Sequence, residues 1–157
     1  MNWDQVCERQ DLRDLPYKIE LNRFGQIVMS PASNHHGFLQ VKIATSLVEI
    51  GDGASRVITE CSVDTTDGTK VADVAWRSGA FRNERGSETP YSRAPEICVE
   101  IQSPSNSKAE MEFKRTLYFE AGAKEMWICN EAGELAFYAE SGRMDSSRLF
   151  PKFPVTV

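Results

Sequence analysis

The passage from residue 96 to residue 130 constrains the fold of this chain more than any other part of its sequence. An apolar run over residues 96–102 ends at a Ser-Pro pair, a helical pattern follows over 107–121, and a second strand-like run begins at Glu125. Two strands joined through a helix can pair in parallel, but only by way of such a crossover. The passage therefore predicts an α/β or α+β domain with a mixed central sheet and helices packed on it.

Turn and capping residues mark the other elements of the first half. Residues 17–21 and 26–29 flank a turn and predict an N-terminal β-hairpin. From about Asn34, apolar residues recur at steps of three and four, which indicates a helix that ends at the glycines of residues 51–53. Two strand-like runs joined by an Asp-Gly turn predict an antiparallel hairpin over residues 56–76.

Two further segments complete the chain. The polar segment 78–95 contains two glycines and two prolines, and we expect a loop of the kind that often serves as a lid or a binding loop. Residues 135–138 indicate a last strand. The tail, residues 141–157, is polar and then rich in proline.

Length and composition limit the class of protein. A chain of 157 residues predicts one domain, residues 1–157. No apolar run approaches the roughly 18 residues of a membrane helix, and the N-terminus lacks the pattern of a secretory signal. We therefore expect a cytoplasmic protein that binds no membrane. The net charge of −5 argues against non-specific binding to a polyanion, although a local basic surface can coexist with it.

Three ionisable residues stand where an apolar residue is expected. Asp73 interrupts a run with the composition of a buried strand, and Glu100 lies near the end of the strand over 96–102. Lys114 falls in the apolar stripe of the second helix, where its ammonium group would face Glu100. Each has an ordinary explanation: an edge strand for Asp73, a salt bridge for Glu100, and a snorkelling stem for Lys114. A common site explains all three at once.

These residue types supply the chemistry of phosphodiester hydrolysis. Two carboxylates can hold Mg²⁺, or Mn²⁺ in its place, and leave room in its shell for water and a substrate phosphate. A nearby ammonium group can stabilise charge on the attacked phosphate or orient the attacking water. Asp73 and Glu100 would have to lie within about 8 Å of each other to share the ion. Glu96, at the other end of the strand, is expected to carry a solvated or structural charge.

Six segments spread along most of the chain, from about Tyr17 to Tyr138, form one pattern. They are Ile19-Glu20-Leu21, Ile27-Val28-Met29-Ser30-Pro31, His36-x-x-Leu39-x-x-x-Ile43, Ala72-Asp73-Val74-Ala75, Glu96-Ile97-Cys98-Val99-Glu100-Ile101-Gln102-Ser103-Pro104-Ser105 and Lys114-x-x-x-Tyr118-x-x-x-Gly122-x-x-x-Met126-Trp127. With these segments the sequence resembles the Uma-two family of endonucleases, in the restriction-endonuclease-like PD-(D/E)xK superfamily.

The resemblance implies a restriction-endonuclease-like α/β fold, in which a mixed central sheet is flanked by helices and preceded by the N-terminal hairpin. It also implies a metal-dependent nuclease site that uses Asp73, Glu100 and Lys114. Glu20, from the hairpin, is implied as a further catalytic residue and a possible additional ligand.

Two residues have less definite roles under this resemblance. Where the superfamily carries a lysine, two positions after the second acid, this chain has Gln102. The lysine role is therefore assigned to Lys114, and Gln102 is expected in the site and among the metal ligands, through its side chain or its backbone carbonyl. His36 is a further catalytic candidate, although such a residue is more often a satisfied core histidine.

The expected function is Mg²⁺-dependent hydrolysis of phosphodiester bonds, with DNA as the first candidate substrate and a homodimer as the expected assembly. The alternative is an inactive nuclease-fold module that binds nucleic acid or a protein partner, because the net charge is acidic and Gln102 replaces the lysine. A third hypothesis is a structural subunit that dimerises through a sheet edge or through residues 135–157. Walker A, GxGxxG, HExxH and GxSxG motifs are absent, so the sequence supports none of those classes.

Overall fold

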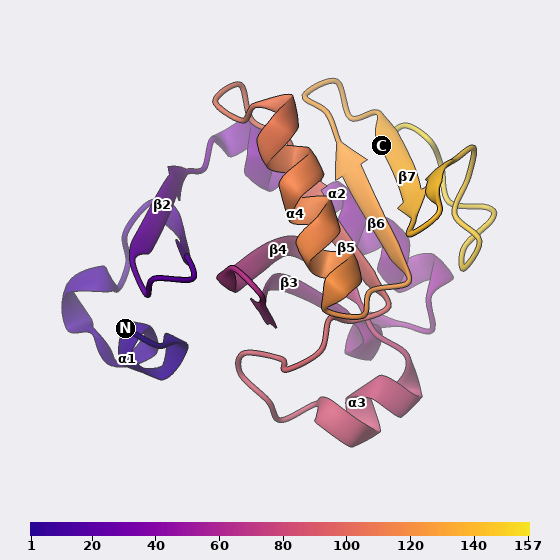
Figure 1. Cartoon of the computed structure of the whole chain (residues 1–157). Helices are drawn as coiled ribbons and strands as arrows, with labels where there is room; N and C mark the ends of the chain where they lie inside the picture. The colour runs from indigo at the N-terminus through magenta and orange to yellow at the C-terminus, as the bar shows by residue number, and fades with distance from the viewer.

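A six-stranded sheet forms the centre of the computed structural model, which describes residues 1–157 (Figure 1). Its strands lie in chain order: β3 (Val57–Thr65), β4 (Gly68–Trp76), β5 (Ile97–Ile101), β6 (Glu125–Cys129), β7 (Leu135–Ala139) and β8 (Gly142–Met144). The β5 and β6 strands pair in parallel, and every other neighbouring pair is antiparallel. The sheet is therefore mixed, with a helical crossover between its parallel strands, as the passage 96–130 predicts.

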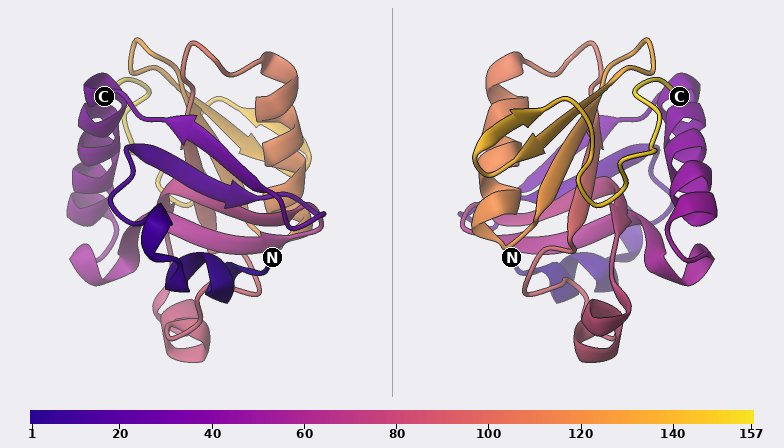
Figure 2. Two further views of the ribbon diagram at one scale, coloured as in Figure 1. Left: turned by 90° about the vertical axis from the view of Figure 1, so that its left-hand side faces the viewer. Right: turned by 90° about the vertical axis from the view of Figure 1, so that its right-hand side faces the viewer.

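Two long helices cover the two faces of this sheet. α2 (Asn34–Ile50) lies on one side and α4 (Lys108–Glu120) on the other, with the strands between them (Figure 2). Ser33 caps α2 by accepting from the His36 N–H, and Ser107 forms a capping box at the start of α4. The predicted α/β architecture with flanking helices is confirmed. No helix combines the length and the apolar character that crossing a membrane requires.

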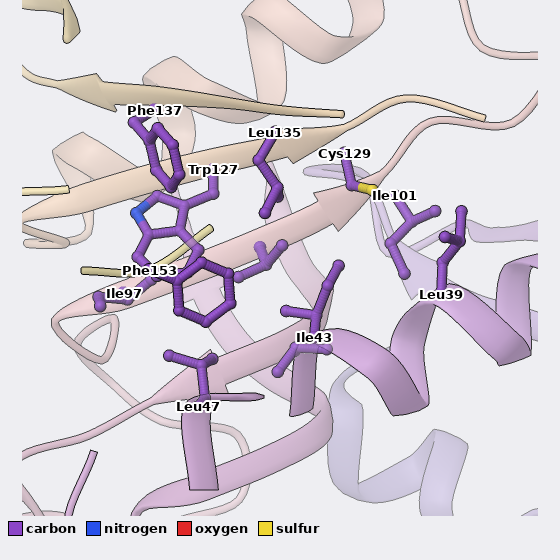
Figure 3. Close-up of a cluster of buried hydrophobic side chains, with 12 residues drawn as sticks. Leu39, Ile43, Leu47, Ile97, Ile101, Trp127, Cys129, Leu135, Phe137 and Phe153 are labelled. Carbon is purple, nitrogen blue, oxygen red and sulfur yellow. The ribbon is translucent and has the colours of Figure 1, made fainter. Parts of the chain in front are cut away.

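Alternation along β5 divides the core into two layers. One cluster joins the odd-numbered residues of β5 to α2 and to the aromatic rings of the last third of the chain (Figure 3). In that cluster Trp127 packs against Phe137 and Phe153, with ring centroids 5.1 and 4.7 Å away, so Phe153 anchors the C-terminal tail. Cys98 belongs to the second cluster, with Tyr118 of α4. Glu100 has the parity of Cys98 and therefore faces α4.

The N-terminal hairpin forms a separate two-stranded sheet, as predicted. Its strands are β1 (Tyr17–Leu21) and β2 (Ile27–Pro31), and they follow α1 (Trp3–Glu8) and a 3₁₀ turn (Gln10–Leu12). Hydrogen bonds tie the end of β1 to β4: the Val71 N–H donates to Glu20 Oε1 (2.9 Å), and Lys70 Nζ donates to the Leu21 carbonyl (3.0 Å). These bonds hold β1 against the main sheet, with the hairpin extending across its side between α2 and α4 (Figure 2).

Part of the segment 78–95 is helical, so its prediction as a loop throughout was wrong. α3 spans Gly79–Arg85, and a second 3₁₀ turn, Ala54–Arg56, precedes β3. Ser78 caps α3 by accepting from the Phe81 N–H, and the buried Phe81 ring packs edge-on against Tyr91. Glu96 accepts from the Ser78 N–H (2.9 Å) and thus has a structural role at the start of this helix.

Candidate active site

Three buried carboxylates meet where the N-terminal hairpin packs on the sheet. Asp73 of β4, Glu100 of β5 and Glu20 of β1 are 0, 3 and 7% exposed. Asp73 and Glu100 line a cavity of about 350 Å³. Burying ionised acids side by side is costly unless cations or hydrogen-bond donors compensate them. The groups that contact these three acids therefore define what the site can do.

The backbone around Asp73 explains how a carboxylate fits inside the sheet. The β4–β5 ladder ends at the neighbouring residue, Val74, and the Ile101 N–H donates to Asp73 Oδ2 (2.6 Å). On the other side, Glu60 of β3 has a positive φ of 53°, and the Gln40 side chain of α2 donates to the Asp73 carbonyl (2.8 Å). Side-chain groups thus replace ladder partners around Asp73, and its second oxygen, Oδ1, is left for other contacts.

Lys18 of β1 is the cation at the centre of the cluster. Its Nζ lies 2.8 Å from Asp73 Oδ1, 3.0 Å from Glu100 Oε2 and 3.9 Å from Glu20 Oε1. Lys18 is not among the site residues predicted from the sequence. The available signal was strand parity, because Lys18 and Glu20 are two positions apart on β1 and share a face.

Lys114 of α4 approaches the same acids from the other side. Its Nζ donates to Glu20 Oε1 (2.8 Å) and to Glu100 Oε2 (3.2 Å), so the contact with Glu100 predicted from the helical stripe is present. One turn later, the buried Tyr118 hydroxyl donates to Glu100 Oε1 (2.7 Å). The Lys-x-x-x-Tyr spacing therefore places both side chains on one helical face, where together they contact both oxygens of Glu100.

His36 lies at the start of α2 and contacts Asp73 Oδ1. Its Nε2 is 3.2 Å from Asp73 Oδ1, the oxygen that Lys18 also contacts. The hydrogen bond to Asp73 raises the pKa of His36, and burial opposes the shift only in part. The structure thus brings His36 into the cluster rather than into the apolar core.

Burial and the charges within the cluster shift the pKa values of its acids and of Lys18. Burial alone would raise the pKa of Asp73, but Lys18 and His36 outweigh it and hold the pKa well below the ordinary value. Burial also opposes ionisation of Glu20, yet the Lys114 and Lys18 ammonium groups lower its pKa. For Glu100 burial prevails and raises the pKa despite the same two lysines. Lys18 is itself buried, but the attraction of the acids raises its pKa well above the ordinary value.

Gln102 is the predicted site residue that the structure does not bring into the cluster of acids and lysines. It follows the last residue of β5, and its N–H donates to the Cys129 carbonyl (2.8 Å). Its side chain lines two neighbouring hollows beyond the strand end, with Asn130 and other residues. The ammonium groups near the acids come instead from Lys18 and Lys114.

The acids supply oxygens that suit a hard cation. Asp73 Oδ1 and Glu100 Oε2 both lie within 3.0 Å of Lys18 Nζ and are thus at most about 6 Å apart. No group of three or more His, Cys, Asp or Glu side chains has an arrangement that could hold a metal ion as it stands. Two carboxylate oxygens that converge on one cation nevertheless form a donor set that fits Mg²⁺, which takes one or two carboxylates and completes its shell with water and phosphate. In the structure the Lys18 ammonium group contacts both of these oxygens.

The mixed sheet between two helices has the fold of a solved structure described as a putative nuclease. The chain belongs to the Uma2 family: the family model, described as "Putative restriction endonuclease", matches residues 4–149. A crystal structure from Anabaena variabilis, described as a putative nuclease belonging to DUF820, superposes with a TM-score of 0.63 and 18% sequence identity. The match covers 77% of this chain and 71% of that chain, and at this identity it shows the fold alone. No curated protein matches the sequence.

Proposed function

We propose that this protein is a Mg²⁺-dependent nuclease that hydrolyses phosphodiester bonds in DNA, with Asp73 and Glu100 as the metal-binding acids. One observation carries the proposal: Asp73 Oδ1 and Glu100 Oε2 converge on a single cationic centre beside a cavity. Membership of a family described as restriction endonucleases supports the reaction class. Mn²⁺ is expected to replace Mg²⁺, because both are hard cations that oxygen ligands suit.

Each side chain of the cluster has a part in this proposal. A bound Mg²⁺ would polarise the phosphate and lower the pKa of an attacking water. The Ile101 N–H and the Tyr118 hydroxyl position the two acids by donating to the oxygens that face away from Lys18. Lys114 lines the cavity, and we assign its ammonium group to the charge that develops on the phosphate.

Glu20 and His36 act through these groups. Glu20 Oε1 accepts hydrogen bonds from the Val71 N–H and from Lys114 Nζ, so it fixes the position of the Lys114 ammonium group. His36 positions Asp73, whose Oδ1 it contacts. We therefore treat Glu20 and His36 as positioning residues.

Local basic groups support a nucleic-acid substrate despite the net charge of −5. Three cations, Lys108 and Arg115 of α4 and Arg143 of β8, outnumber the two acids, Glu112 and Glu134, that line a hollow of about 390 Å³ on the side of α4. A third hollow links the two: it shares Ser103 and Asn106 with the cavity of the acids, and Gln102 and Asn130 with the hollow beside α4. A phosphate backbone crossing the cavity would thus meet further cations along α4.

Cleavage of supercoiled plasmid DNA in the presence of Mg²⁺ or Mn²⁺ tests the proposal. The wild type should nick or linearise the plasmid, and Asp73→Ala and Glu100→Ala should abolish cleavage. Glu84→Ala is the matched control, because Glu84 is an exposed acid on α3 that contacts Arg85 and Arg93 at the surface. No cleavage by the wild type would overturn the proposal. Cleavage by Asp73→Ala and Glu100→Ala at the wild-type rate would also overturn it.

The alternative function is a nuclease-fold module that binds nucleic acid or protein without cutting. The ammonium groups already paired with the acids and the position of Gln102 outside the cavity favour it. Thermal unfolding with and without Mg²⁺ or Mn²⁺ separates the two functions. A nuclease should melt at a higher temperature with the metal, and the module should not respond.

A further inference from the structure

The position of Lys18 has a consequence for any metal that this site binds. Its Nζ makes a 2.8 Å contact with Asp73 Oδ1 and a 3.0 Å contact with Glu100 Oε2. These are the two oxygens that would have to ligate a divalent ion. Mg²⁺ requires ligand distances of about 2.0–2.1 Å, so an ion held by both oxygens would lie close to the ammonium group and be repelled by its charge.

The charges around the acids show why a cation stands there. Glu20 and Glu100 share the ammonium group of Lys114, whereas Asp73 contacts only Lys18 and His36 among the cationic side chains. Without Lys18, three buried carboxylates would face one lysine and one histidine. A fixed counter-charge within 3.0 Å of two of them offsets much of their mutual repulsion.

The side chain of Lys18 also has somewhere to go. It is 11% exposed, and it lines the cavity together with Tyr17, Ser30 and His36. A lysine side chain is a flexible stem of four carbons joined by rotatable bonds. The ammonium group can therefore leave the acids and enter the cavity without movement of β1. Lys114 contacts Glu100 from α4 and can stay in place when Lys18 leaves.

We propose that Lys18 is a metal-competing residue, whose ammonium group occupies the cation position between Asp73 and Glu100 and must leave it when a divalent ion binds. Lys18 thereby sets the affinity of the site for the metal. Monovalent ions offer no gain in charge over an ammonium group and do not displace it, whereas a divalent ion does. This inference rests on the proposed metal-dependent function and adds a residue that the resemblance to the family does not assign.

Calorimetric titration with Mn²⁺ in the absence of nucleic acid tests the competition. Lys18→Met keeps the length of the stem and removes the charge, so it should bind Mn²⁺ roughly tenfold more tightly, or tighter still, than the wild type. Lys124→Met is the matched control: it also removes one positive charge, but Lys124 is exposed and lies outside the cavity, just before β6. Its affinity should stay within about twofold of the wild type. Equal or weaker binding by Lys18→Met would overturn the inference.

A second measurement uses the unmodified chain, in case Lys18→Met does not fold. The ¹H–¹⁵N spectrum of the lysine ammonium groups should contain a protected Lys18 signal in metal-free protein, assigned by its loss in Lys18→Arg. Saturating Mg²⁺ should remove or strongly shift this signal, whereas Na⁺ at the same ionic strength should not. A Lys18 signal that stays unchanged at saturating Mg²⁺ would contradict displacement.

These results can be distinguished from those of the plasmid assay. If Lys18→Met tightens Mn²⁺ binding but the wild type cleaves nothing, the competition stands and the nuclease function fails. If the wild type cleaves and Lys18→Met leaves Mn²⁺ affinity unchanged, the nuclease function stands and the competition fails.

Discussion

Two buried glutamates on the parallel strands of the sheet differ in the groups that satisfy them. Glu125, at the start of β6, is 2% exposed and accepts from the Trp127 indole N–H (2.8 Å), the Ser147 hydroxyl (2.7 Å) and the backbone N–H groups of Arg148 and Leu149. Glu100, at the end of β5, is 3% exposed and depends on two lysines and a tyrosine.

The difference separates a structural acid, Glu125, from Glu100, the acid that we propose to be functional. The donors of Glu125 are neutral and fixed by the backbone or by packing, and none of them lines the cavity with Asp73. The lysines on Glu100 are cations on flexible side chains that line that cavity. A buried carboxylate alone therefore does not mark a site. Exchangeable cationic partners beside a cavity do, because a metal or a phosphate can replace or join them.

The largest effect is expected for Glu100→Gln on cleavage. Loss of a metal-binding acid should lower the rate of plasmid cleavage roughly a thousandfold, since metal-ion catalysis contributes several kcal/mol. The free energy of unfolding of the variant should stay close to that of the wild type. Burial and the neighbouring acids already disfavour the ionised form of Glu100 in the folded state and raise its pKa, so a neutral side chain costs little there. Single-turnover cleavage and urea unfolding measure the two quantities. Normal cleavage would remove Glu100 from the site.

Glu125→Ala should give the opposite result. Four hydrogen-bond donors would lose their acceptor, two of them in buried and two in part-buried hydrogen bonds, so the free energy of unfolding should fall by roughly 3 kcal/mol. Cleavage per folded molecule should match the wild type. Urea unfolding checks the first statement, and cleavage at a temperature where the variant is folded checks the second. A stable Glu125→Ala variant without cleavage would reverse the comparison.

Tyr118→Phe should have an intermediate effect. It removes the hydroxyl that donates to Glu100 Oε1 but keeps the buried ring. Because the hydroxyl positions a metal-binding acid, we expect a roughly tenfold to hundredfold loss in cleavage or in Mn²⁺ affinity. Tyr138→Phe, on β7, is the matched control, since that ring stacks with Arg115 outside the cavity. Equal activity of the two variants would mean that Glu100 needs no such positioning.

Glu88→Gln should have the smallest effect and shows what donors do for an exposed acid. The N–H and hydroxyl of Ser92, with Arg85, donate to Glu88 and lower its pKa from 4.5. A pKa lowered by folding stabilises the protein above the unfolded-state value and loses this contribution as the pH falls through the folded-state value. The variant should therefore melt slightly below the wild type at neutral pH, and the difference should shrink at acid pH. A difference that grows towards acid pH would contradict this sign.

The fold was largely predictable because its elements carry local signals. Periodicity, caps and turns marked both hairpins, α2, α4 and the crossover between β5 and β6. α3 was missed because it is short and polar, and its anchor is the single buried ring of Phe81. The C-terminal tail resembled an irregular segment, yet Phe153 is buried against Trp127 by contacts that no local pattern encodes.

Only part of the candidate site was predictable, because only some of its residues carry a local signal in the sequence. Asp73, Glu100 and Lys114 stood out because each interrupts an apolar pattern. Lys18 belongs to a short strand of alternating polar residues, where a lysine indicates a solvent-facing side, and its burial depends on how the hairpin packs on β4. Glu125 was equally inconspicuous, because an acid at the start of a strand is usually solvated.

Diffraction from crystals grown with Mn²⁺ tests the central claim most directly, because anomalous scattering locates the ion without reference to activity. We expect a strong anomalous peak within about 2.5 Å of a carboxylate oxygen of both Asp73 and Glu100, with the Lys18 ammonium group moved into the cavity. Well-ordered crystals at saturating Mn²⁺ without a peak there, in which Lys18 still contacts both acids, would contradict it.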